Sequence, residues 1–162
     1  MAHEDILIAN AVAVWKSAYD RADKLFSGLG DEDLWKEVSP QRNRLIYLWG
    51  HLTAMHDRMI ALLGLGDRVE PAFDAIFLTA PDRANELPSL DQVRDTWRQV
   101  SDRLNKGIAG ITAEQWFEKH TAVSEADFNL DPLRNRLSIL LTRTNHLSYH
   151  LGQANLVRLK TA

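Results

Sequence analysis

The chain has 162 residues and no cysteine, and its 19 Lys and Arg against 22 Asp and Glu leave a formal net charge of −3. Without cysteine it can build neither a disulfide framework nor a thiolate zinc site, and the acidic balance argues against general binding to nucleic acid. The length suits one domain, so we expect residues 1–162 to form a single domain. No apolar run is long enough to span a membrane, and the N-terminus lacks the basic residues of a secretory leader. We therefore expect a cytoplasmic protein with no membrane partner.

Apolar residues recur at steps of three and four along most of the chain, which is the spacing of one face of a helix. This spacing predicts a first helix over residues 5–27 and a second over residues 41–64, each followed by glycines. Gly50 lies inside the second helix and Gly152 inside a later one. Because a glycine within a helix costs up to about 1 kcal/mol relative to alanine, both positions indicate close packing or access to a neighbouring group.

Two further helices are marked by their expected N-termini. Ser89, after a proline, predicts the start of a third helix that runs to Gly107. The pair Asp131–Pro132 predicts the start of a fourth helix that continues close to the C-terminus. No segment alternates with period two for long enough to compete as a strand. The predicted fold is therefore all-α, a four-helix bundle.

The segments between the predicted helices are long, at about a dozen residues for the first and over twenty for the others. An up-down bundle needs only about two to eight residues per connection. At least one connection can therefore cross from one end of the bundle to the other and place neighbouring helices parallel. Trp35 and Trp116 lie in these connectors, where we expect short helical turns that pin them to the bundle. Trp49 is a candidate for a pocket or dimer contact, with core packing as the alternative.

Three of the six histidines are candidates for one metal site. His146 and His150 are four residues apart in the fourth helix, so both imidazoles lie on one face and can bind one divalent ion. His51 lies in the apolar second helix and can meet them if the two helices pack face to face. His56 is rotated by about 140° from His51 and is expected to be structural or exposed. Spacing alone leaves open a second interpretation, in which the histidines are solvated or singly hydrogen-bonded and bind no metal.

Four polar residues share a helical face with these histidines and are candidates for a pocket: Tyr47, Arg58, Arg143 and Gln153. Arg143 or Arg58 could hold an anionic substrate, although surface ion pairs are the alternative use. Gln153 is expected to orient a ligand or to pack against its helix. Asp57 is about 240° from His51, so it does not share that face. The sequence therefore identifies no catalytic base.

Two segments, NRLIYLWGHLTAMHDRM in the second helix and TNHLSYHLGQANLVRL in the fourth, resemble the DinB-like family, which is related to the YfiT-like metal-dependent hydrolases. The resemblance covers essentially the whole chain. The family pattern has one histidine in the second helix and H-x-x-x-H before a G-Q step in the fourth. These positions correspond to His51, to His146 and His150, and to Gly152–Gln153. The resemblance implies an up-down-down-up bundle with long crossover connections, a divalent metal held by three histidines, and a homodimer.

The resemblance implies a metalloenzyme that acts on a small-molecule substrate, either as a hydrolase or as a transferase that uses a low-molecular-weight thiol. Three neutral imidazoles leave a coordination position open, as catalytic sites do. Nitrogen ligands suit zinc or nickel, and iron is a further candidate. Since imidazoles must be neutral to bind, we expect the ion to leave below about pH 6. The alternative is a non-catalytic dimeric helical bundle that binds a small ligand or a partner.

Overall fold

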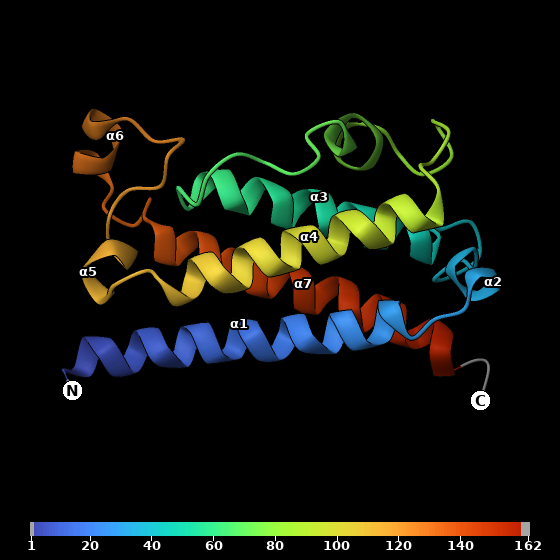
Figure 1. Ribbon diagram of the computed structural model, residues 1–162, viewed down its shortest axis with the longest axis horizontal. Coiled ribbons are helices and arrows are strands. Elements are labelled where there is room, and N and C mark those ends of the chain that lie inside the picture. Colours follow the sequence, from blue (N-terminus) through green and yellow to red (C-terminus); the bar gives the residue numbers. More distant parts are fainter. Residues whose placement is uncertain (1, 160–162) are drawn as a thin grey trace.

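The computed structural model describes residues 2–159, with side chains described for residues 2–157. Four long helices lie side by side along the long axis of the molecule (Figure 1): α1 (His3–Ser27), α3 (Leu45–Leu62), α4 (Leu90–Ala109) and α7 (Arg136–Leu159). No strand occurs in the described part of the chain, where only two isolated bridges are present. The predicted all-α class is thereby confirmed. Among residues 2–159, no helix is both long enough and apolar enough to cross a membrane.

The four long helices run in two opposite directions. In Figure 1, α1 and α7 run from left to right, whereas α3 and α4 run from right to left. The long segment between α3 and α4 returns along the outside of α3 and contains the π-helical turn η1 (Ala75–Thr79), which contacts α3. α7 packs against both α1 and α3, and α3 also packs against α4. α3 is consequently buried on nearly all sides and carries one of the three candidate histidines.

Aromatic side chains fill the centre of the bundle. The Tyr19 ring of α1 stacks on the Trp97 ring of α4, with 4.8 Å between centroids. The indole Nε1 of Trp97 donates to the Asp23 carboxylate at 2.7 Å, a second link between these helices. Trp49 is only 1% exposed and stacks on Phe26, with centroids 5.6 Å apart. Trp49 therefore belongs to the core, and it lines neither a pocket nor an exposed face.

Two helices begin later than the sequence predicts. α3 starts at Leu45, whereas the prediction was residue 41, because Gln41 has a φ of 63° and the preceding chain turns back to form the bridge between Glu37 and Arg44. α7 starts at Arg136, so the predicted cap at Asp131–Pro132 is wrong. Asp131 instead ends the short helix α6 (Glu125–Leu130), and the Asn135 side chain caps α7 by accepting from the backbone N–H of Ser138 at 2.9 Å.

Short helices interrupt the connectors, as expected around the two tryptophans. They are α2 (Asp31–Leu34) and α5 (Ala113–Trp116). Trp116 is buried and anchors α5 against the bundle. Trp35 follows α2 and remains 45% exposed, with the Arg44 guanidinium 5.1 Å from its ring centroid. Only Trp116 is therefore an apolar anchor, while Trp35 forms a cation–π contact near the surface.

Candidate metal centre

The side chains of His51, His146 and His150 meet between α3 and α7. His51 Nε2 lies 3.0 Å from His146 Nε2, and His150 Nε2 lies 3.1 Å from the same atom. One ligand nitrogen from each of the three residues lies within 4.8 Å of the other two. Two nitrogens bound to one ion at about 2.0–2.1 Å would be roughly 2.9–3.4 Å apart at tetrahedral or right-angle geometry. The two closest separations fall in this range.

Hydrogen bonds orient two of the three imidazoles. His51 Nδ1 donates to the backbone carbonyl of Phe77 at 2.9 Å, and His150 Nδ1 donates to Oε1 of Gln153 at 2.8 Å. Because Nδ1 carries the proton in each neutral ring, each Nε2 carries a lone pair that faces the centre. Partners of this kind commonly fix the tautomer and orientation of metal-binding histidines. Gln153 thus contacts the His150 imidazole through its side-chain oxygen.

The donor set is suited to a cation. The lone pairs of His51 and His150 both face Nε2 of His146, whose single proton could satisfy only one of them. Within the described part of the chain, the other nitrogen of His146, Nδ1, is buried and has no hydrogen-bond partner. A shared divalent ion would replace this repulsion by coordination from all three nitrogens. The three residues therefore fit a metal ion.

Gly50 explains how the Phe77 carbonyl reaches His51. Phe77 lies in the π-helical turn η1, and its ring packs directly on the α3 backbone at Gly50. A Cβ at this position would overlap the Phe77 ring, so a side chain here would force η1 away from α3. The Tyr47 hydroxyl holds the end of the same turn by donating to the Ala80 carbonyl at 2.7 Å. Tyr47, predicted as a pocket residue, therefore has a structural partner.

Burial and positive charge keep the histidines neutral. Desolvation lowers the pKa of His51 and His150 below the ordinary value. Desolvation and the neighbouring histidines lower the pKa of His146 to about 3. The positive charge of Arg143, one turn before His146, lowers the pKa values of His51 and His146 further. Neutral imidazoles are the form that binds a metal ion.

The other candidates divide into those with partners and those without. Arg58 pairs with Asp74 at 2.8 Å, which agrees with the ion-pair interpretation. Arg143 is partly buried, and no described carboxylate lies within 4.0 Å of it.

Asp57 accepts from the backbone N–H groups of Val69 and Glu70, so it anchors the connector and does not face the histidines. His56 is fully buried beside Tyr19 and Trp97, as a structural residue.

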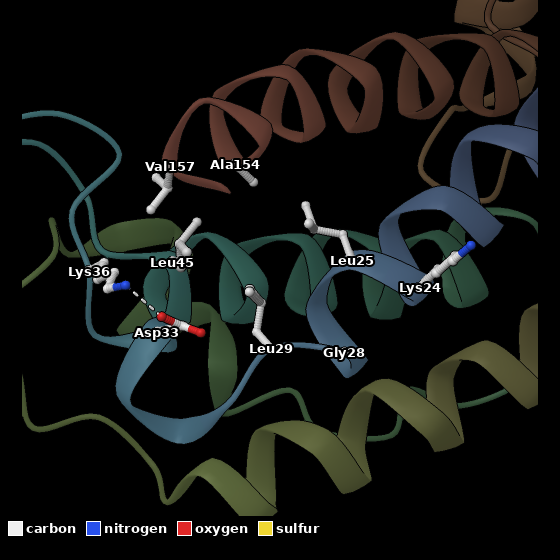
Figure 2. Close-up of a pocket in the computed structure, with 9 residues that line it drawn as sticks. All are labelled: Lys24, Leu25, Gly28, Leu29, Asp33, Lys36, Leu45, Ala154 and Val157. Atoms are coloured by element: carbon white, nitrogen blue, oxygen red, sulfur yellow. Dashed lines mark ion pairs between the residues drawn. The ribbon is translucent and has the colours of Figure 1, made fainter. Parts of the chain in front are cut away.

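A cavity of about 470 Å³ lies at one end of the bundle, between α1, α2, α3 and α7 (Figure 2). Its apolar surface includes Leu45 and Ala154, and Lys24 and the ion-paired Asp33 and Lys36 also line it. None of the three histidines lines this cavity. A second cavity, of about 540 Å³, is lined by Gln153 and Tyr149 and so adjoins the histidine centre.

Sequence reasoning missed Phe77 and Tyr149. Phe77 contributes a backbone carbonyl, which any residue carries, so only the unexplained Gly50 pointed to a close neighbour there. Tyr149 contacts the His150 ring edge-on with centroids 5.1 Å apart, and its hydroxyl accepts from Nε2 of Gln153 at 3.2 Å. Gly152, predicted to indicate close packing or access to a neighbouring group, is exposed, and a Cβ there would meet no atom within 4 Å. Within this chain, close packing at Gly152 is therefore wrong.

Comparison with known proteins bears on the fold and on the family of the chain. A crystal structure of a conserved protein from Enterococcus faecalis has a similar fold, with a TM-score of 0.63 and 15% sequence identity, over 98% of this chain and 96% of that one. At this identity the likeness concerns the fold alone. No curated protein matches the chain. The sequence matches the DinB superfamily over residues 15–154, a stretch that includes all three histidines. The chain therefore belongs to the DinB superfamily.

Proposed function

We propose that this protein is a divalent-metal-dependent enzyme, a hydrolase or a transferase that uses a low-molecular-weight thiol, in which His51, His146 and His150 hold the ion. The observation that carries the proposal is the convergence of three Nε2 atoms, with 3.0 and 3.1 Å between neighbours. Zinc and nickel suit three imidazole ligands, and iron is a further candidate. When bound, such an ion supplies a Lewis acid that polarises a substrate or activates water or a thiol.

The chain's own residues orient the ligands and set the charge of the site. The Phe77 carbonyl and Gln153 hold His51 and His150 with their Nε2 atoms toward the centre. Arg143 adds positive charge beside His146, and the three ligands contribute no negative charge. An anionic substrate or a thiolate would be attracted to such a site. Arg143 is our candidate for a residue that faces the substrate, whereas Tyr47 and Arg58 are held by Ala80 and Asp74.

We also propose that residues 1–162 form one domain, that the four long helices correspond to the up-down-down-up bundle of the family, and that the protein is a homodimer. The packing of α7 against α1 and α3, and of α3 against α4, supports the single domain. The opposite directions of α1 and α7 against α3 and α4 support the topology. The homodimer rests on the family resemblance. Light scattering tests it, because a dimer has twice the 18.4 kDa mass of the chain. A concentration-independent monomer would reject it.

Metal analysis tests the proposed function. We expect about one divalent ion per chain in protein purified without chelator or affinity tag, and loss of that ion in His146→Ala and His150→Ala with helical content retained. His3→Ala is the matched control, because His3 is exposed and is the first residue of α1, a helix that carries none of the three histidines. Wild-type protein that stays metal-free after incubation with zinc, nickel or iron would reject the enzyme proposal.

A further inference from the structure

The lining of the cavity of about 540 Å³ beside the histidine centre combines polar and apolar side chains with one positively charged side chain. The cavity lies between the loop before α3 and the second half of α7, and its volume is in the range of small-molecule sites. Val38, Tyr149 and Leu156 supply apolar surface. The Tyr149 and Leu156 side chains are 63% and 55% exposed, so a bound molecule would cover apolar surface that now faces solvent.

Arg42 supplies the positive charge in the lining of this cavity. Its side chain is exposed and lines the cavity, and no carboxylate of the described residues lies within 4.0 Å of its guanidinium. Nearby arginines are occupied: Arg44 pairs with Asp82 at 2.6 Å, and Arg83 pairs with Glu37. Among the cavity-lining residues there is no Asp or Glu. A guanidinium that pairs with no described carboxylate is available to bind an anion, and its planar donors match a carboxylate.

The wall that carries Arg42 is held in place before any ligand binds. The Val38 N–H donates to the Asn43 carbonyl at 3.0 Å, and the Arg42 N–H donates to the Ser39 carbonyl at 2.9 Å. Arg44, directly after this turn, makes several hydrogen bonds to the buried Asp82 carboxylate. A pre-ordered wall reduces the entropy lost on binding.

The opposite wall belongs to the histidine centre. Gln153 lines the cavity and accepts from His150, and Tyr149 lines the cavity and contacts the His150 ring. We propose that this cavity binds the recognition part of the enzyme's substrate, a small molecule that combines a carboxylate with an aromatic or branched apolar group. This inference rests on the proposed function. The carboxylate pairs with Arg42, the apolar group covers Tyr149 and Leu156, and the reacting end extends past His150 toward the metal ligands.

Calorimetric titration of the metal-loaded protein tests the proposal, with phenylacetate and 3-phenylpropionate as probes and their primary amides as neutral controls. We expect both acids to bind at least tenfold more tightly than the amides, and the preference to weaken at high salt because Arg42 is exposed. Arg42→Ala should remove the preference, and Arg42→Lys should retain part of it. Arg21→Ala, which removes an exposed arginine from α1, should leave it unchanged. Leu156→Trp should weaken binding of acids and amides alike, because the larger side chain fills the cavity.

Failure of this inference is distinguishable from failure of the proposed function, since metal content is measured on the same preparations. Metal-loaded protein that binds acid and amide equally, or binds neither, overturns the cavity proposal alone. An acid preference that survives Arg42→Ala also overturns it. An acid preference that depends on Arg42 in protein that cannot bind metal would overturn the proposed function while the anion site stands.

Discussion

The backbone carbonyl of Phe77 lies 2.9 Å from Nδ1 of His51 and fixes the orientation of that imidazole. This contact joins a π-helical turn in a long connector to the most buried helix of the bundle. It depends on Gly50, whose missing side chain lets the Phe77 ring reach α3. A glycine that weakens a helix therefore positions one residue of the proposed metal centre.

Gly50→Ala is expected to displace η1 and to loosen the hydrogen bond to His51. Overpacking of this kind costs about 1–3 kcal/mol, and loss of an orienting partner typically lowers metal affinity by about 10–100-fold. Thermal unfolding and competition with a metal indicator measure the two effects. Gly152→Ala is the matched control, because a Cβ there meets no atom within 4 Å and alanine favours the helix. Equal behaviour of the two variants would refute the role assigned to Gly50.

Gln153→Leu should weaken metal binding without removing it. The substitution deletes the acceptor of the His150 Nδ1 proton but leaves all three ligand nitrogens in the chain. We expect a loss of about 10–100-fold in affinity. Asn155→Leu, on an exposed position of the same helix, is the control and should bind metal normally. If Gln153→Leu bound metal as tightly as the wild type, Gln153 would have no positioning role.

The pH at which metal leaves should be lower than an ordinary histidine site would give. Burial lowers the pKa values of all three histidines, so protons compete with the metal only at more acidic pH. We therefore expect half of the bound Co²⁺ to be released below pH 6. The absorption bands of bound Co²⁺ measure this release. Release of half of the Co²⁺ above pH 6.5, the ordinary histidine pKa, would contradict the lowered pKa values of the three histidines.

His56 should make the fold less stable in mild acid. Its burial lowers the pKa to about 4, against 6.5 in the unfolded chain, so the unfolded state binds more protons between these values. The stability contribution is complete above pH 6.5 and is lost as the pH falls toward 4. His56→Phe should reduce the slope of unfolding free energy in this window by up to about 1.4 kcal/mol per pH unit.

Denaturant titrations of chelator-treated protein at several pH values measure this slope. The chelator removes the contribution of metal binding to stability. The other histidines then contribute equally to the slope in the wild type and in His56→Phe. His3→Ala, which changes an exposed histidine, is the control variant. A His56→Phe slope identical to that of the wild type would show that His56 does not titrate on unfolding.

The sequence by itself determined the all-α class, the approximate positions of the four long helices and the shared face of His146 and His150. These features depend on local spacing: apolar residues at steps of three and four define helix faces, and His146 and His150 share a face because they are four residues apart. Helix starts were less accurate. The start of α7 depends on the Asn135 cap, which competed with an equally plausible Asp131–Pro132 signal.

Only the tertiary structure decided which groups surround the three histidines and orient them. The Phe77 carbonyl has no signature in the sequence, since every residue carries the same group, and it approaches His51 only because a connector folds back over Gly50. The surroundings of Trp49 and Arg58 likewise depend on residues distant in sequence. Trp49 stacks on Phe26 in the core, and Arg58 pairs with Asp74. Residue spacing sets which side chains share a face, but partners distant in sequence meet only when the helices and connectors pack.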